Sequence, residues 1–147
     1  MRVGTGYDSH RFEEGRRLVL GGVHIPDHPG LSGHSDGDAI THAVIDAILG
    51  AAAMGNIGSH FPPDDEIWKG ADSMDLLERT RQILESKGFT VVNIDVTVIC
   101  EKPKMAPHLD AMKKRFGEVL QLTSDRVSIK GKSNEGLGWI GSGEGLA

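Results

Sequence analysis

The stretch from Leu31 to Asp46 constrains this chain most, because a loop rich in glycine, histidine and acid runs directly into a predicted helix. Three side chains that can cap a helix start precede it: Ser35, Asp36 and Asp38. Apolar residues then recur at helical spacing from Ala39 onward: Ile40, Ala43, Val44, Ala47 and Ile48. The sequence therefore predicts a helix whose first turn adjoins a polar, glycine-spaced loop.

His42 lies one turn inside this helix, and Asp46 follows four residues later on the same face. A histidine that binds a metal usually has its second ring nitrogen held by a carboxylate or a carbonyl, so Asp46 is the expected partner. A partly exposed histidine beside an acid is an equally good interpretation of this stretch alone.

Asp8 and His10 follow a short glycine-spaced segment, residues 2–7, which we interpret as a first strand. Residues two apart on an extended segment face the same way, so both side chains should point to one side. With His42 they make two imidazoles and one carboxylate, a set that suits a catalytic zinc or a ferrous iron. Many strand ends carry Asp-x-His without a metal, so this pair is a weak pattern by itself.

Size and charge exclude several classes of protein. The 147 residues suit one domain, and 20 glycines without a repeat indicate turns and close backbone approach. A net charge of −5 argues against a nucleic-acid partner. The sequence has one cysteine, no signal-peptide core and no long apolar run. We therefore expect no membrane partner and a cytoplasmic chain, or a mature form stripped of a targeting peptide.

The predicted elements mix strands and helices. They are a hairpin at 18–25 around Gly21-Gly22, helices from 39, over 73–87 and over 108–120, and strands over 90–100 and 127–132. Because βαβαβ alternation is absent, we predict an α+β fold with helices on one face of a sheet. Segments 50–65 and 133–145 are predicted loops, and the second has the polar, glycine-rich composition of a phosphate-cradling loop.

Seven motifs occur in one order along the whole chain. They are Asp8-Ser-His10, Gly33-His-Ser-Asp-Gly-Asp38, His42, Gly55-Asn-Ile-Gly-Ser-His-Phe-Pro62, Lys69-Gly-Ala-Asp-Ser73, Pro103-Lys-Met105 and Gly143-Glu-Gly145. Together they resemble the 2-C-methyl-D-erythritol 2,4-cyclodiphosphate synthases of non-mevalonate isoprenoid biosynthesis. The resemblance implies a ferredoxin-like, four-stranded sheet with helices on one face, and a homotrimer with active sites between chains. It also implies a phosphorus–oxygen lyase that closes a cyclic diphosphate from 4-diphosphocytidyl-2-C-methyl-D-erythritol 2-phosphate and releases CMP.

The resemblance also implies roles for single residues. Zinc, or another divalent transition metal, would be bound by Asp8, His10 and His42, and magnesium or manganese by Glu135. His34 and Ser133 would stabilise the transition state. Substrate would be bound by Asp8, Ser9, His10, His34, Ser35, Asn56, Ile57, Gly58, Phe61, Pro62, Pro63, Asp64, Asp65, Lys132, Ser133, Asn134, Glu135 and Trp139. The cytidine end would be bound from the neighbouring chain by Cys100, Glu101, Lys102, Pro103, Lys104, Met105 and Ala106.

The sequence departs from the family's pattern at several places. Asn56 stands where the family typically has Asp, Ser133 replaces Thr, and Ser142 stands where many members have Arg. The sequence stops at Ala147, whereas the family continues through a final strand, so we predict one domain, 1–147, without that strand and with a weakened trimer.

Four alternatives stay open beside a fully active synthase. A ferrous oxygenase would use the same three ligands, although no arginine is placed to anchor a 2-oxo acid. A zinc-dependent binding protein would hold the substrate without releasing CMP, and a diphosphate hydrolase on the same scaffold would open it with water. The substitutions at positions 56 and 142 would leave a weak synthase. The compartment expected for the synthase is the bacterial cytoplasm, or the plastid stroma if a transit peptide has been removed.

Overall fold

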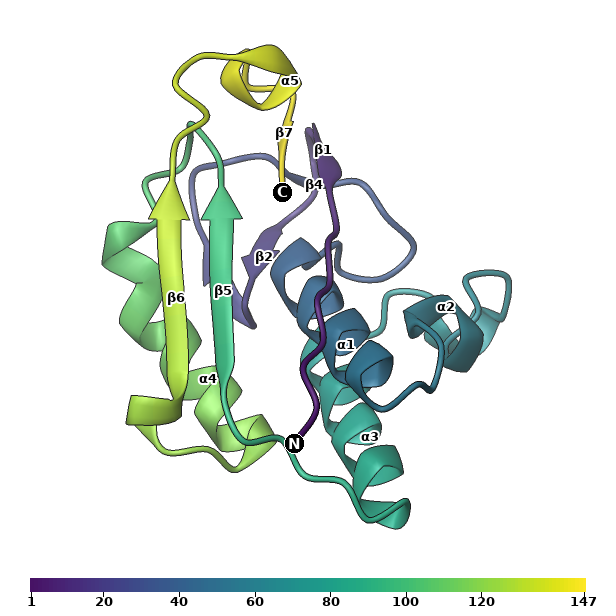
Figure 1. The fold of residues 1–147 in the computed structure, drawn as a ribbon. Coiled ribbons are helices and arrows are strands. Elements are labelled where there is room, and N and C mark those ends of the chain that lie inside the picture. The colour runs from purple at the N-terminus through teal and green to yellow at the C-terminus, as the bar shows by residue number, and fades with distance from the viewer.

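The computed structural model describes all of residues 1–147 as a mixed α/β domain (Figure 1). Its strands are β1 (His10–Glu13), β2 (Leu18–Leu20), β3 (Val23–Ile25), β4 (Gly30–Leu31), β5 (Ile94–Ile99), β6 (Val127–Lys132) and β7 (Gly145–Leu146). Its α-helices are α1 (Ala39–Ala51), α2 (Ile57–His60), α3 (Ser73–Ser86), α4 (Leu109–Leu120) and α5 (Gly138–Gly141), with 3₁₀ turns η1 (Glu66–Trp68), η2 (Ala106–His108) and η3 (Ser124–Arg126). The three predicted helices are confirmed as α1, α3 and α4, whereas the two predicted loops contain short helical turns and β7.

β5 and β6 are parallel, paired from Ile94 with Val127 to Ile99 with Lys132. Parallel neighbours need a crossover connection, and α4 supplies it, lying against one face of the pair (Figure 1). The strand predicted over 90–100 is shorter than expected. Because β6 begins at Val127 and an η3 turn precedes it, residues before Ile94 have no partner strand there.

The strand ladders form three sheets, with orders β4-β1-β7, β2-β3 and β5-β6, rather than the single four-stranded sheet that was predicted. The sheets are nevertheless connected, since Ile99 and Ala147 exchange two backbone hydrogen bonds of 2.7 and 3.1 Å. These bonds place the C-terminal residue beside β5 and so bring β1, β7, β5 and β6 next to one another.

The hairpin predicted at 18–25 is confirmed as β2 and β3, and it is tied to the start of α1 by Asp38. The carboxylate of Asp38 accepts the backbone N–H groups of Gly21 (2.9 Å) and Gly22 (2.8 Å). It also caps α1 by accepting from the N–H (3.0 Å) and hydroxyl (2.7 Å) of Thr41. One fully buried side chain thus fixes the hairpin turn to the helix.

A single hydrophobic core lies between the helices and the strands, where α1 packs on α3 and α3 on α4. Its fully buried large side chains include Leu18, Leu20, Leu31, Ile45, Leu49, Leu77, Met112, Phe116 and Leu146. No helix of the chain combines the length and apolar content that a membrane span requires.

The N-terminal segment 2–7 is not the predicted strand, because it packs against a helix instead of another strand (Figure 1). A Cβ added at Gly4 would lie 1.9 Å from the carbonyl oxygen of Ala47, and one at Gly6 would lie 1.9 Å from that of Ala43. The two glycines therefore allow the segment to lie directly on the backbone of α1 and to carry Asp8 to its place.

We expect Gly6→Ala to lower the free energy of unfolding by about 1–3 kcal/mol, because the added methyl group would meet helix backbone that has no room to move. Urea unfolding measures the change. Gly50→Ala, near the end of α1, is the matched control, since nothing lies within 4 Å of a Cβ there. Equal stability of the two variants would contradict the close packing.

Candidate metal centre and active site

Asp8, His10 and His42 come together in space, with one possible ligand atom from each within 4.8 Å of the others. Oδ2 of Asp8 lies 2.8 Å from Nε2 of His10 and 3.0 Å from Nδ1 of His42. All three residues are partly buried, and no other three His, Cys, Asp or Glu side chains of the chain meet this distance. The two imidazoles and one carboxylate predicted from the sequence therefore form one compact cluster.

Electrostatics couple the members of this cluster. Burial alone raises the pKa of Asp8, but the hydrogen bonds and charges of His10 and His42 outweigh it and hold that pKa at about 2. The hydrogen bond to Asp8 raises the pKa of His10, against the effect of burial. Nδ1 of His10 donates to the carbonyl of Ser32, which directs Nε2 toward Asp8. A carbonyl that holds the second ring nitrogen is the usual arrangement around a metal-binding histidine.

His42 has different partners from those expected. Its Nε2 lies 3.0 Å from Oγ of Ser35 and 2.9 Å from Oγ of Ser73. The prediction that Asp46 orients the ring is wrong, because Oδ1 of Asp46 accepts the backbone N–H of Ile57 at 2.7 Å, at the start of α2. Helical side chains lean toward the N-terminus, so the His42 ring reaches the loop before α1 instead of the residue one turn later.

The donor set decides which ions the cluster fits. Imidazole nitrogen with a carboxylate suits zinc and other divalent transition metals, whereas magnesium and calcium prefer oxygen ligands alone. Three protein ligands leave positions for water or substrate, which is typical of catalytic sites rather than structural ones. The cluster could therefore hold a metal ion that also contacts a ligand.

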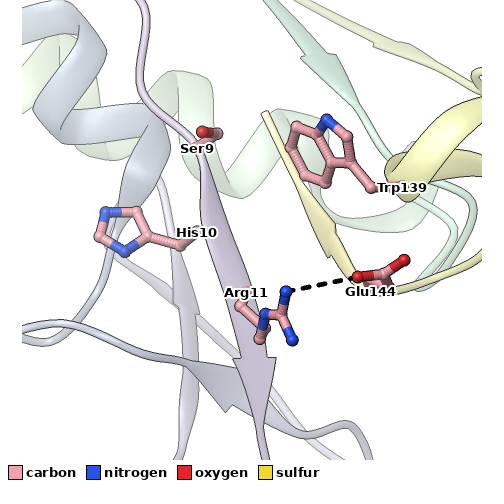
Figure 2. A pocket seen from close by; sticks show the side chains of 5 residues that line it. All are labelled: Ser9, His10, Arg11, Trp139 and Glu144. Atoms are coloured by element: carbon pink, nitrogen blue, oxygen red, sulfur yellow. Dashed lines mark hydrogen bonds and ion pairs between the residues drawn. The ribbon is translucent and has the colours of Figure 1, made fainter.

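A cavity of about 200 Å³ adjoins one member of this cluster, His10 (Figure 2). It is lined by Ser9, His10, Arg11, Trp139 and Glu144. Pairing of β1 with β7, which puts His10 opposite Leu146, brings the C-terminal loop with the predicted substrate residue Trp139 to this place. Arg11 and Glu144 also line the cavity, although neither was predicted as a site residue, and their side chains pair at 3.4 Å (Figure 2). Arg11 directly follows His10 and Glu144 lies within a glycine motif, but neither pattern alone indicates a contact.

A second group of predicted site residues gathers between two loops. Oε1 of Glu101 accepts the backbone N–H groups of Asn134 (2.9 Å) and Gly136 (3.1 Å), and so joins loop 100–106 to loop 133–136. Oγ of Ser133 donates to Oε1 of Glu135 at 2.9 Å. No hydrogen bond or ion pair links Ser133 or Glu135 to the Asp8 cluster within the chain, so the predicted residues form two separate groups.

We expect Glu101→Ala to loosen loop 133–136, because two N–H groups lose their acceptor. Hydrogen exchange at Asn134 and Gly136 should become faster by about tenfold or more, since each such bond contributes ~1–1.5 kcal/mol. Lys102→Ala, at an exposed neighbouring position, is the control. Unchanged exchange in the Glu101 variant would show that the loop keeps its shape without this carboxylate.

Loop 100–106 otherwise divides into exposed and buried positions. Lys102 and Lys104 are exposed, whereas Cys100 and Met105 are buried. Burial raises the pKa of the Cys100 thiol to about 11, so this side chain is a small apolar group.

The predicted substrate residues between 56 and 65 have structural contacts of their own. Oδ1 of Asn56 caps α2 by accepting from the N–H (3.0 Å) and hydroxyl (2.9 Å) of Ser59. Asp65 caps η1, and Phe61 is buried with its ring 5.1 Å from that of Trp68. Six of the predicted site residues in this segment and in the loop before α1 are exposed: His34, Asn56, Gly58, Pro63, Asp64 and Asp65. These caps hold the segment in a fixed shape beside α1.

Comparisons with known proteins show the family of the chain. The family model described as the YgbB family matches residues 1–147. A 2-C-methyl-D-erythritol 2,4-cyclodiphosphate synthase of Synechococcus sp. (strain JA-2-3B'a(2-13)) is 50% identical over 100% of this chain and 94% of its own. The bifunctional IspDF of Campylobacter jejuni is similar in structure, with a TM-score of 0.94 and 41% identity over 99% of this chain and 39% of its own. A 2C-methyl-D-erythritol-2,4-cyclodiphosphate synthase solved in its CDP-bound form has a TM-score of 0.90 and 36% identity, over 99% of this chain and 94% of its own.

Proposed function

This chain belongs to the YgbB family of 2-C-methyl-D-erythritol 2,4-cyclodiphosphate synthases, and we propose that it carries out their reaction by intramolecular phosphoryl transfer. An oxygen of the substrate's 2-phosphate bonds to the β-phosphorus while the bond from that phosphorus to CMP breaks. The products are the cyclic diphosphate and CMP, which makes the enzyme a phosphorus–oxygen lyase. The observation that carries the proposal is the Asp8–His10–His42 cluster beside a cavity, in a chain matched along its full length.

The residues of the Asp8 cluster would hold zinc or another divalent transition metal, and Glu135 would hold magnesium or manganese with the diphosphate. Divalent cations bound there would neutralise charge on the phosphate oxygens. The attacking phosphate is already anionic at neutral pH, so the chain needs no general base. We assign transition-state stabilisation to His34 and Ser133, whose exposed side chains can donate hydrogen bonds to oxygens that gain charge.

Two further groups of residues would position the substrate. The erythritol part would contact the segment of Asn56, Ile57, Gly58, Phe61, Pro62, Pro63, Asp64 and Asp65. Ser35 would help to fix the phosphates, and Ser9 and Trp139 would also bind the substrate. The cytidine diphosphate end would lie along residues 100–106 and along Lys132 and Ser133 of the neighbouring chain, with Asn134 and Glu135 next to them. The hydrogen bonds of Glu101 support this assignment, because they hold loop 100–106 and loop 133–136 together as one surface.

We propose a homotrimer in which the two groups of site residues from neighbouring chains complete each active site. Within one chain no hydrogen bond or ion pair joins Ser133 or Glu135 to the Asp8 cluster, which supports this arrangement. Tyr7 and Leu137, each 69% exposed, provide apolar surface for such contacts. The bonds between Ile99 and Ala147 support a ferredoxin-like core with β1, β7, β5 and β6 as one four-stranded sheet. We place the enzyme in the bacterial cytoplasm or the plastid stroma, without nucleic-acid or membrane partners.

Phosphorus NMR with the cytidine diphosphate substrate, zinc and magnesium tests the proposal. We expect CMP and the cyclic diphosphate to appear in equal amounts. CMP with a linear diphosphate would instead identify a hydrolase, because water would have replaced the internal phosphate as nucleophile. Retention of the substrate by zinc-loaded protein without turnover would identify a binding protein, and activity with iron and oxygen an oxygenase.

A further inference from the structure

We propose that Ser73 and Asp36 are positioning residues that keep a proton on Nε2 of His42 and thereby leave Nδ1 free to bind a metal. The inference rests on the metal-binding role given above to His42. It concerns two residues that the substrate and metal sites do not include, one at the start of α3 and one in the loop before α1.

The Ser73 hydroxyl has one proton to donate, and this determines which way its hydrogen bond to His42 runs. Its hydroxyl has a single proton, which is donated to Oδ1 of Asp36, while its backbone N–H donates to Oδ2 of the same carboxylate at 2.9 Å. A carboxylate that receives both groups can only accept. Toward His42, the Ser73 oxygen can therefore act only as an acceptor, and the 2.9 Å contact requires a proton on Nε2.

The other nitrogen of the ring, Nδ1, faces the metal cluster. Nδ1 of His42 lies 3.0 Å from Oδ2 of Asp8, the carboxylate that belongs to the same cluster, and without a metal this contact is a hydrogen bond that Nδ1 donates. A metal ion bound by Asp8 and His42 would take the place of that Nδ1 proton, while Nε2 keeps its own. With Nε2 protonated, the lone pair of a neutral ring is on Nδ1 and faces the other two ligands. Ser35, 3.0 Å from Nε2, can share that proton as a second acceptor and does not oppose this arrangement.

The hydrogen-bonded chain from Asp36 through Ser73 to His42 is also rigid. Ser73 is fully buried, so water does not compete for its hydroxyl. Asp36 is fixed in turn, because its Oδ1 accepts the N–H of Asp38 at 3.1 Å and its own N–H donates to the carbonyl of Ala71 at 3.3 Å. Ring orientation and proton position in His42 are therefore set jointly by the start of α1 and the start of α3.

Zinc affinity and nitrogen-15 NMR of the histidine rings test the inference on the whole chain. In the zinc-loaded protein we expect the His42 ring to carry its proton on Nε2 and to bind through Nδ1. Ser73→Ala should weaken zinc binding by ~10–100-fold, the usual effect of removing such a partner. Ser73→Thr, which keeps the hydroxyl, should recover part of that loss, and Ser86→Ala on the exposed end of the same helix is the matched control.

Two results would overturn the inference. One is a zinc-loaded wild-type protein whose His42 carries its proton on Nδ1, a measurement that needs no variant to fold. The other is zinc affinity unchanged in a folded Ser73→Ala protein. Both differ from failure of the proposed metal site, in which the wild-type chain itself would not bind zinc at the cluster.

Discussion

Replacing His42 by alanine is expected to abolish cyclisation while the protein remains folded. The variant removes one of three possible ligands from the cluster with Asp8 and His10, so zinc affinity should fall by ~100-fold or more. Loss of the bound cation removes several kcal/mol of charge stabilisation from phosphoryl transfer, which corresponds to ~10³-fold or more in turnover. Zinc content of the purified protein and the phosphorus NMR assay measure the two effects.

His24→Ala is the matched control for this variant, because His24 is exposed on β3 and outside the cluster. It should bind zinc and turn over like the wild type. Since His42 is only partly buried, thermal unfolding of its variant without metal should stay within a few degrees of the metal-free wild type. Normal turnover by His42→Ala would show that the ligand assignment is wrong.

The largest loss of stability is expected from Asp38→Ala. This side chain is fully buried and accepts four hydrogen bonds, from the N–H groups of Gly21, Gly22 and Thr41 and from the hydroxyl of Thr41. Removing it leaves these donors without a partner inside the protein, where each unpaired group costs about 1–3 kcal/mol. We expect the free energy of unfolding to fall by about 3–5 kcal/mol, a large part of what a domain of this size has. Urea unfolding of the metal-free protein measures it.

Asp38→Asn separates the roles of the two carboxylate oxygens. Its amide keeps one acceptor oxygen but turns an NH₂ donor toward N–H or hydroxyl donors, so this variant should also be destabilised. Asp72→Asn is the control, because Asp72 caps α3 from an exposed position and asparagine is an equally good cap. If Asp38→Asn were as stable as this control, the hydrogen bonds to the hairpin would contribute little.

The departures from the family's pattern acquire local explanations in the structure. Asn56 caps α2 through its side-chain oxygen, a role that asparagine fills as well as aspartate. Oγ of Ser142 lies 3.1 Å from both the carbonyl of Trp139 and Oε1 of Glu144, the carboxylate that also pairs with Arg11. The serine thus helps to shape the C-terminal turn beside the cavity.

Patterns of neighbouring residues in the sequence determined most of the secondary structure of this protein. The helices and the hairpin follow from apolar spacing, capping residues and glycines, all of which act over a few residues. The same range explains why Asp8 and His10 could be placed on one side of the chain from their spacing alone. It also explains two failures. No pattern of neighbouring residues shows that segment 2–7 lies on a helix, or that the Asp46 carboxylate accepts the N–H of Ile57.

Only the tertiary structure decided what lies around the ligands. Sequence resemblance selected Asp8, His10 and His42, but their distances depend on how the N-terminal segment packs on α1. The partners of His42 come from a loop and a helix start more than a turn away in sequence, and the cavity needs β7 beside β1. Hydrogen bonds are short and directional, so such contacts exist only after distant segments have packed. The sequence therefore determined the elements and the possible ligands, and packing determined which atoms face one another.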